Sequence, residues 1–417
     1  MVVEPVDMKI SDKQARDKQD SEKAGKSGSV QQEVIFKSAV AEVELHRYPR
    51  RKNQKLRAWD AADDYLLQYA NEKKLLTTGV SILIVNDVFG GLSLPLQQYK
   101  PTVMTDSFIS RQAIIDNCKT NAIDVEQITL LNSLDDLHEL HAASFDLVLI
   151  KVPKSLSMLE DQLYRIRPVL GDSSIVIAAG MTKNIHTSTL ALFEQIIGVT
   201  SSSRAQKKSR LIFSKYNAAL TLTENPYPKS YDLPYKLDDE AIRVSNHAAV
   251  FSQAKLDIGT RFLIENIAAD EKYKTIVDLG CGNGAVGLIA AIKNPQASLI
   301  FTDESFMAVD SAISNFVSIF DETREAEFLQ TDCLAGVENA SVSLILCNPP
   351  FHQNNTITDD IAWQMFTESR EALAIKGELW VIGNRHLSYF AKLKHLFGEC
   401  EVVASNKKFS IIKAIKL

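Results

Sequence analysis

A glycine-rich turn and an Asn-Pro-Pro motif in the second half of the chain combine residue types that can bind a ligand and orient an amine. A predicted strand at 276–278 leads into the turn Leu279-Gly-Cys-Gly-Asn-Gly284. Because glycine has no Cβ, such a turn can bend sharply and admit a ligand close to the backbone. Asp303 ends the next predicted strand, where its carboxylate can accept both hydroxyls of a ribose. The alternative for Asp303 is an N-cap of the helix expected at 307–316, and the glycine turn alone is a weak signal.

The second motif, Asn348-Pro349-Pro350-Phe351, follows the apolar run 342–346. The two prolines restrict the backbone and hold Asn348 extended. The Asn348 side-chain oxygen and the Pro349 carbonyl oxygen can then present two acceptors on one side. An exocyclic amine that donates both N–H groups to them aims its nitrogen lone pair at an electrophile opposite. Phe351 offers a face on which a base can stack, worth roughly 1–3 kcal/mol; the alternative for this motif alone is a rigid loop.

Apolar strands that alternate with helical segments would position both motifs. The second half predicts strands at 275–278, 299–302, 342–346 and 378–382, and helices at 286–293, 307–316, 361–374 and 387–397. Such alternation is typical of βαβ units and a parallel sheet. Ligands bind at the carboxyl ends of the strands in a doubly wound sheet, so the glycine turn, Asp303, Asp332 and Asn348 would meet there.

The first half repeats this order of elements. It predicts strands at 81–85, 102–105, 145–150 and 174–178, and helices at 58–69, 110–120, 156–167 and 187–197. Each half then ends in two polar-spaced strands, at 200–203 with 210–215 and at 401–404 with 409–415. Three landmarks also align: Thr105-Asp106-Ser107 with Thr302-Asp303-Glu304, Asn117 with Asn315, and 152–154 with 348–350.

We therefore predict an α/β fold of two tandem, doubly wound, Rossmann-like domains that arose by duplication. A polar segment at 1–33 has too little apolar surface to offset its ordering entropy and is expected to be disordered. The first domain is expected at 34–225 and the second at 236–417. The seam between them, at 217–236, is polar and punctuated by prolines.

The composition is that of an ordinary globular protein. The chain has 417 residues, a net charge of -6, 45% hydrophobic and 24% charged residues. No apolar run approaches the roughly 18 residues of a membrane span, and the first residues lack the apolar core of a secretory signal. Five scattered cysteines without a CxxC pair favour a reducing compartment and offer no metal site. We expect a cytoplasmic protein with no metal, no membrane contact and no obligate protein partner.

The two motifs together resemble the class I S-adenosylmethionine-dependent methyltransferases, in the N-methylating branch with an Asn-Pro-Pro-aromatic motif. Phe351 followed by His352-Gln353, and the segment 246–259, are similar to bacterial ribosomal RNA guanine-N2 methyltransferases, the RsmC/RlmG family. A tyrosine after the prolines is commoner in DNA adenine and protein glutamine methylases. The likeness to the large-subunit (23S) branch runs from about 45 to 417 and includes the segments at 58–63, 86–90, 150–154, 185–189 and 384–387.

This resemblance implies methyl transfer from S-adenosylmethionine to the exocyclic N2 of a guanine in large-subunit ribosomal RNA. It implies that the methionine end of the cofactor is held by Asp278, Gly280, Cys281, Gly282, Asn283 and Gly284. Asp303 would bind the ribose, and Asp332 would lie near the adenine amino group, although a loop cap is an even alternative for Asp332. Asn348, Pro349, Pro350 and Phe351 would hold the guanine, with Asn348 bordering the cofactor. The sulfonium activates its own methyl, so positioning, which can contribute ~7–11 kcal/mol, does most of the work.

The first domain lacks both motifs. It has Asn86-Asp-Val-Phe-Gly-Gly91 in place of the glycine turn and Lys151-Val-Pro-Lys154 in place of Asn348 to Phe351. We therefore predict that this degenerate domain binds no cofactor, performs no catalysis and holds RNA instead. The side chains expected to contact phosphate are Lys151, Lys154, Arg204, Lys207, Lys208 and Arg210.

The target guanine must be unpaired or flipped, which favours protein-free or partly assembled large-subunit RNA. Three alternatives remain open at this point. The enzyme could act on a guanine of small-subunit ribosomal RNA, or on a protein glutamine or a DNA adenine. The chain could also be a non-catalytic RNA-binding assembly factor that retains the fold.

Overall fold

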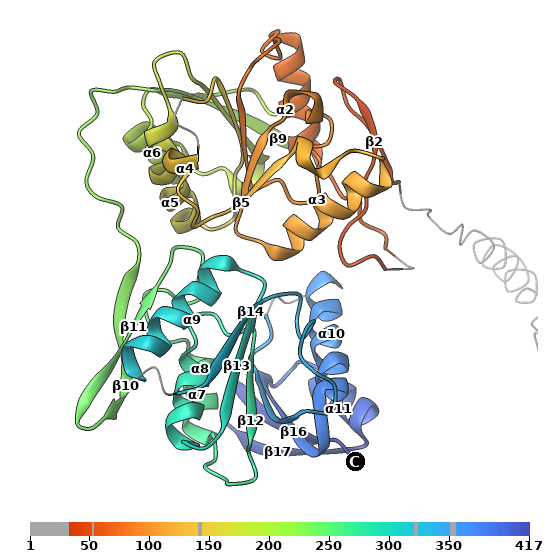
Figure 1. Ribbon diagram of the computed structural model, residues 1–417, viewed down its shortest axis with the longest axis vertical. Coiled ribbons are helices and arrows are strands. Elements are labelled where there is room, and N and C mark those ends of the chain that lie inside the picture. The colour runs from red at the N-terminus through yellow and green to blue at the C-terminus, as the bar shows by residue number, and fades with distance from the viewer. Residues whose placement is uncertain (1–32, 52–53, 141–143, 321–323, 351–355) are drawn as a thin grey trace, which may run out of the picture.

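Two α/β units are stacked in the computed structural model of the chain, which describes residues 33–51, 54–140, 144–320, 324–350 and 356–417 (Figure 1). Nearly all of the expected N-terminal tail therefore lies outside the described residues. Each unit is built on a seven-stranded sheet, and an extended segment along one side joins the two units.

The second domain has the strand order β14-β13-β12-β15-β16-β18-β17. The strands are β12 (Thr275–Leu279), β13 (Ser298–Asp303), β14 (Ala326–Gln330), β15 (Val342–Cys347), β16 (Leu373–Asn384), β17 (Glu399–Ser405) and β18 (Phe409–Ile415). The helices are α7 (Ile258–Asn266), α8 (Ala285–Lys293), α9 (Phe306–Ile319), α10 (Thr356–Ala372) and α11 (Tyr389–Phe397). The first five strands run parallel and β18 is antiparallel to β16, so the predicted doubly wound sheet is confirmed.

The first domain has the same arrangement, with the order β5-β4-β3-β6-β7-β9-β8. Its strands are β3 (Ile82–Val85), β4 (Thr102–Thr105), β5 (Thr129–Asn132), β6 (Leu147–Lys151), β7 (Ile175–Met181), β8 (Thr200–Ser202) and β9 (Ser209–Lys215). Its helices are α2 (Ala61–Glu72), α3 (Phe108–Thr120), α4 (Leu137–Leu140), α5 (Leu156–Ile166) and α6 (Thr187–Ile196). The central strands are buried along their whole length, which explains their continuous apolar sequences.

Each domain is preceded by a two-stranded hairpin that sequence analysis did not predict. The hairpins are β1 (Ile35–Lys37) with β2 (Glu42–Glu44), and β10 (Lys229–Leu237) with β11 (Glu240–Asn246). The second hairpin occupies part of the seam that was expected to be a polar linker. Leu233, Ile242 and Val244 of this hairpin are buried in the core of the second domain, which is why a proline-punctuated stretch is ordered.

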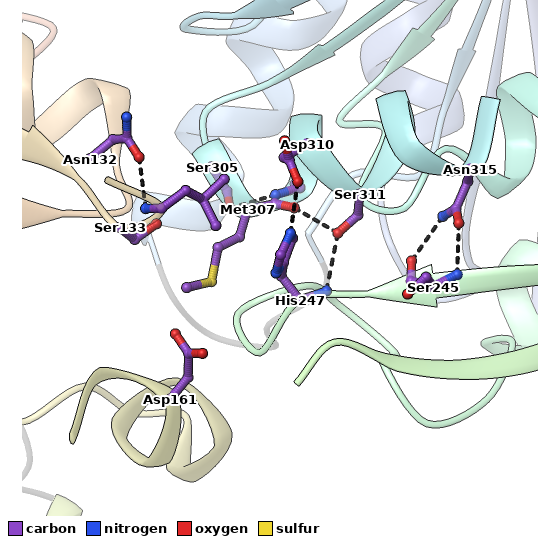
Figure 2. A network of polar contacts seen from close by, with 12 residues as sticks. Asn132, Ser133, Asp161, Ser245, His247, Ser305, Met307, Asp310, Ser311 and Asn315 are labelled. Carbon is purple, nitrogen blue, oxygen red and sulfur yellow. Dashed lines mark hydrogen bonds and ion pairs between the residues drawn. The ribbon is translucent and has the colours of Figure 1, made fainter. Parts of the chain in front are cut away.

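An asparagine on the helix after the second strand clamps each hairpin to its domain. Asn315 on α9 accepts from the Ser245 N–H at 2.7 Å and donates to the Ser245 carbonyl at 2.8 Å (Figure 2). Asn117 on α3 makes the same pair of bonds with the backbone of His46, at 3.0 and 2.8 Å. The predicted correspondence of Asn117 with Asn315 is therefore confirmed at the level of contacts.

The alignment of Thr105-Asp106-Ser107 with Thr302-Asp303-Glu304 is wrong by one residue. Ser107 and Ser305 are the N-caps of α3 and α9, and each side chain accepts from the backbone N–H three residues later. The caps therefore pair Asp106 with Glu304. Both segments contain Thr-Asp, but the correspondence between the domains follows the helix starts at Ser107 and Ser305 and not this shared dipeptide.

These same residues form a reciprocal contact between the domains. The Phe108 N–H donates to the Glu304 carbonyl at 2.8 Å, and the Phe306 N–H donates to the Asp106 carbonyl at 3.0 Å. The hydroxyl of Ser107 donates to the Glu304 carboxylate, while the hydroxyl of Ser305 donates to the Asp106 carboxylate. Burial raises the pKa of Asp106 to about 6 and the pKa of Glu304 to about 7.

This buried carboxyl pair predicts a pH-dependent stability. Both pKa values in the folded protein lie above the ordinary values, so the contribution of the pair is complete below about pH 4 and is lost as the pH rises through 7. Between pH 5 and pH 8 the wild type should lose about 4 kcal/mol of unfolding free energy relative to the Asp106→Asn/Glu304→Gln variant. Denaturant unfolding of both proteins at the two pH values measures this difference. Parallel pH profiles would contradict it.

Candidate active site

The glycine turn joins β12 to α8 with a left-handed backbone at each glycine. The φ angles of Gly280, Gly282 and Gly284 are +73°, +55° and +79°. A Cβ at Gly284 would lie 3.1 Å from the Ala312 Cβ on α9, whereas one at Gly282 would have its nearest neighbour at 3.9 Å. The turn therefore packs closely against the domain at Gly284 and leaves room beside Gly282, as a backbone that admits a ligand should.

Asp303 connects the end of β13 to this turn. Its Oδ2 accepts from the Gly282 N–H at 3.0 Å, and its Oδ1 accepts from the Ser305 N–H at 3.0 Å. The N-cap of α9 is Ser305, so the helix-cap alternative for Asp303 is wrong. Each carboxylate oxygen keeps a further lone pair, and burial raises the pKa of Asp303. These are the features that a ribose-binding carboxylate needs.

Asp278 lies beneath the turn at the end of β12. Only 3% of this residue is exposed, and its Oδ2 accepts from the Gly287 N–H on α8 at 2.8 Å. Burial raises the pKa of Asp278 to about 8. A cation placed nearby would favour the ionised carboxylate, so Asp278 is suited to the positively charged end of a ligand.

Cys281 and Asn283 hold the shape of the turn. The Cys281 N–H donates to the Thr302 carbonyl at 3.0 Å, and burial raises the pKa of its thiol well above the ordinary value. The Asn283 side chain accepts from the Ala285 N–H at 3.2 Å and donates to the Tyr231 hydroxyl at 3.1 Å. Tyr231 belongs to the hairpin β10–β11, so the hairpin also supports the turn.

Asp332 lies in the next loop along the same sheet edge and is buried. The preceding Thr331 N–H donates to the Asp303 carbonyl at 2.9 Å, which joins this loop to the strand end that carries Asp303. The turn is closed by the main-chain carbonyl of Asp332, which accepts from the Ala335 N–H at 3.0 Å. The structure thus brings the predicted residues Asp278, Asp303 and Asp332 to one edge.

Asn348 follows β15 at this edge, and its amide is held from one side only. The Asn348 Nδ2 donates to the Thr260 hydroxyl on α7 at 2.9 Å. The Asn348 Oδ1 is buried and has no hydrogen-bond partner among the described residues. Leaving such an acceptor unpaired costs about 1–3 kcal/mol, and an arriving N–H donor removes that cost. Pro349 is buried and Pro350 exposed, whereas Phe351 lies outside the described residues.

The first domain has an ion pair in place of this hydrogen bond. Lys151, the last residue of β6, takes the place of Asn348, which follows β15 directly. Asp63 is the third residue of α2, as Thr260 is of α7. The Lys151 Nζ lies 2.7 Å from Asp63 and 2.9 Å from Asp60, and only 8% of Lys151 is exposed. The prediction that Lys151 contacts RNA phosphate is therefore wrong, because its ammonium group is enclosed by two carboxylates.

The first domain also fills the space beside its own turn. The Asp87 carboxylate accepts from the backbone N–H groups of Gly90, Leu92 and Ser93. A Cβ at Gly90 would lie 2.4 Å from the Leu94 side chain, and Phe89 is buried. These contacts support the prediction that no cofactor binds there, which stays a prediction.

The hairpin β8–β9 of the first domain carries most of the predicted RNA contacts and is largely exposed. Arg204, Lys207 and Lys208 lie on its surface and Arg210 is half-buried. The Lys207 Nζ is 3.0 Å from the Asp64 carboxylate. Lys154 is also exposed, so these residues remain predicted RNA contacts. No helix among the described residues is long and apolar enough to span a bilayer, and no group of three or more potential metal ligands occurs among them.

Sequence analysis missed Thr260 and Tyr231 as parts of the site. Thr260 directly follows the segment 246–259, whose likeness to the family implies no role for it. No local pattern marks either residue, because each acts through a partner that is distant in the sequence.

Comparison with known proteins agrees with this geometry. Residues 33–218 match the family model described as RLMG N-terminal domain, and residues 241–413 match Methyltransferase small domain. The chain is therefore an S-adenosylmethionine-dependent methyltransferase. A ribosomal RNA large subunit methyltransferase G from Streptomyces coelicolor is 44% identical, covering 89% of this chain and 97% of its own length. That from Photobacterium profundum is 46% identical over 90% and 97%. The chain belongs to the ribosomal RNA large subunit methyltransferase G family.

A solved structure shares the fold over both domains. The 16S rRNA N2 G1207 methyltransferase RsmC of T. thermophilus, in complex with AdoMet and guanosine, has a TM-score of 0.72 and 20% identity. The match covers 92% of this chain and 97% of that one. The tandem arrangement of two methyltransferase-like domains is thus confirmed.

Proposed function

We propose that the second domain transfers a methyl group from S-adenosylmethionine to the exocyclic N2 of a guanine in large-subunit ribosomal RNA. The observation that carries this proposal is the buried, unpaired Oδ1 of Asn348 beside the glycine turn. An acceptor fixed at this edge complements an amine that must be held with its lone pair facing the cofactor. The names of the relatives favour large-subunit RNA over small-subunit RNA, DNA or protein as the substrate.

The residues present fit the cofactor. Asp303 keeps lone pairs for the ribose, the space beside Gly282 admits a ligand, and the buried Asp278 suits a cationic group. We assign Asp278, Asp303 and Asp332 to its methionine, ribose and adenine parts, with the backbone of 280–284 against the methionine end. When bound, S-adenosylmethionine supplies a methyl group already activated by the sulfonium.

The chain then acts by positioning the amine. The guanine N2 donates to the Asn348 Oδ1 and to the Pro349 carbonyl, which turns the nitrogen lone pair toward the methyl carbon. S-adenosylmethionine held by Asp278, Asp303 and Asp332 would supply the methyl group to this nitrogen, and the amine would release its proton to solvent. This scheme uses no acid, base or metal, because alignment can supply about 7–11 kcal/mol of the barrier and the sulfonium already activates the methyl group.

Thr260 orients the Asn348 amide in this scheme. The Thr260 hydroxyl takes the Nδ2 as its donor, so that Oδ1 is the atom left for the substrate. Thr260→Val keeps the shape but removes this acceptor, and kcat is expected to fall by about 5- to 10-fold, the value of one hydrogen bond. Thr260→Ser should restore kcat, while the dissociation constant for S-adenosylmethionine stays constant in both variants. Equal kcat values for valine and serine would remove Thr260 from the mechanism.

The proposal is tested by the product and by the form of RNA that accepts the methyl group. Cells that lack the gene should lose one N2-methylguanosine from large-subunit RNA, as measured by mass spectrometry of nucleosides. Purified protein should methylate protein-free large-subunit RNA more than intact subunits, since only free RNA can present an unpaired guanine at low cost. Primer extension then maps the position. Methylation of glutamine or DNA adenine instead would overturn the proposal.

We also propose that the first domain holds the RNA through Lys154, Arg204, Lys207, Lys208 and Arg210. Charge reversal of Lys207 and Lys208 is expected to weaken RNA binding and to make its salt dependence shallower by about 0.7 per lost phosphate contact. Titration of labelled RNA at several salt concentrations measures both quantities. An unchanged affinity and slope would exclude this surface.

A further inference from the structure

A second basic surface lies in the catalytic domain itself. A depression of about 630 Å³ is lined by Asn384, Arg385, His386, Lys407 and Lys408. We call this the β16 depression. It is formed by the end of β16 and the turn that joins β17 to β18. The Arg385 N–H donates to the Lys408 carbonyl at 3.0 Å, and this hydrogen bond joins the end of β16 to the β17–β18 turn.

The β16 depression shares the sheet edge that carries the proposed active site. Cys347 of β15 pairs with Val381 of β16, so Asn348 and Asn384 both lie where these neighbouring strands leave the sheet. The glycine turn follows β12, which is the neighbour of β15 on its other side. The order along the edge is therefore cofactor turn, Asn348, and β16 depression.

The charge of the β16 depression contrasts with that of the whole chain. The chain carries a net charge of -6, yet the described residues that line this hollow include no acidic side chain. Arg385, Lys407 and Lys408 are exposed, and the Lys408 ammonium lies 4.9 Å from the Phe409 ring centre. An average surface of this protein repels polyanions, so clustered cations mark a place where a polyanion can approach.

Comparison of the two domains shows that the turn is basic in both copies but carries its cations at different positions. The turn between β8 and β9 also carries a lysine pair, and the Thr182 N–H donates to the Lys208 carbonyl at 2.8 Å, as Arg385 does to Lys408. In that copy, however, the position of Arg385 is held by the uncharged Thr182, and Lys207 is paired with Asp64. Lys183 follows Thr182 where His386 follows Arg385, so the two copies differ in where the cations lie and in the pairing of Lys207, and not in the number of cations.

We propose that the β16 depression binds the phosphodiester backbone of the substrate RNA next to the target guanine. This inference rests on the proposed function and adds a second RNA contact within the catalytic domain. A guanine that leaves its stack brings its adjoining phosphates to the rim of the site. Lys407, Lys408 and Arg385 hold those phosphates and thereby fix the distance of the base from Asn348.

Charge reversal with a matched control tests this proposal. The Lys407→Glu/Lys408→Glu variant is compared with Lys274→Glu/Lys376→Glu, which makes the same change in net charge. Lys274 precedes β12 and Lys376 lies near the start of β16, so both control positions occupy the opposite edge of the same sheet and are exposed. Affinity for protein-free large-subunit RNA, its salt slope, and affinity for S-adenosylmethionine are measured for both variants.

The expected result is at least a tenfold loss of RNA affinity in the Lys407/Lys408 variant, with a salt slope shallower by about 1.4 for two lost contacts to single-stranded RNA. Affinity for S-adenosylmethionine should be unchanged, and the control should bind RNA as the wild type does. An equal loss in both variants, or no loss in either, would overturn the proposal. A wild type that methylates no RNA would instead refute the proposed function, so the two failures are distinguishable.

The Arg385→Ala variant separates local contact from general charge. Its backbone N–H still donates to Lys408, so the walls of the β16 depression stay joined. RNA affinity should fall and the salt slope should become shallower by about 0.7. If Arg385→Ala binds RNA with the wild-type slope while Lys407→Glu/Lys408→Glu does not, long-range repulsion rather than phosphate binding explains the loss, and the proposal fails.

Discussion

Replacement of Asn348 by alanine is expected to lower kcat for RNA methylation by about 10²- to 10³-fold, the effect of removing one preorganised hydrogen-bonding group from a reacting centre. The Asn348 Oδ1 is buried and unpaired, so the enzyme has already met the cost of placing an acceptor where the amine arrives. Without it, the amine has no fixed orientation toward the cofactor. Single-turnover methylation with labelled S-adenosylmethionine measures the loss.

Binding should be spared by the same substitution. In the proposed site, Asn348 contributes one side chain at the reacting centre, whereas many charged contacts would hold the RNA and the glycine turn and carboxylates would hold the cofactor. Affinities of Asn348→Ala for RNA and S-adenosylmethionine should therefore remain close to those of the wild type. Asn71→Ala, on the exposed surface of α2, is the matched control and should keep full activity. Undiminished methylation by Asn348→Ala would end the assigned role.

Replacement of Asp303 by alanine is expected to raise the dissociation constant of S-adenosylmethionine by about 10²-fold or more. Two effects act together, because Asp303 holds the Gly282 N–H and, in the proposed site, would also offer acceptors to the ribose. Hydrogen bonds to a charged group contribute about 1.5–3 kcal/mol each, and 1.4 kcal/mol is a factor of ten. Isothermal titration calorimetry measures this directly.

Two further variants make the Asp303 result specific. Asp303→Asn keeps one oxygen acceptor and should show an intermediate loss. Asp310→Asn, a carboxylate on α9 paired with His247 at 2.8 Å, should bind the cofactor as the wild type does (Figure 2). Tight cofactor binding by Asp303→Ala would show that the ribose is held elsewhere.

The central strands of both sheets could be predicted because they are buried on both faces and therefore continuously apolar. The edge strands β5 and β14 could not, since their side chains are partly exposed and their sequences carry no such run. The hairpin β10–β11 was hidden by its prolines, which suggested a linker. The hairpin is held in place by contacts with α9, such as the hydrogen bond from Ser245 to Asn315, and no local sequence pattern predicts a contact over that distance.

The candidate site was predictable where one short motif carries the chemistry. The glycine turn and the Asn348 motif can each be recognised from a few consecutive residues. Thr260 does not, because it meets Asn348 across 88 residues of sequence. The error over Lys151 has the same origin, since Asp63 is also 88 residues away and only the fold shows that it neutralises the lysine.

The reciprocal contact of Asp106 and Phe108 with Phe306 and Glu304 implies a history for the molecule. A half-turn about an axis between Ser107 and Ser305 exchanges the two sets of hydrogen bonds, which is the isologous geometry of a twofold homodimer. A single-domain ancestor that self-associated in this way would have carried two equivalent catalytic centres. Fusion of two such genes would turn a subunit boundary into an internal one, and one centre would suffice, which fits a first copy that has a lysine held by aspartates in place of the asparagine.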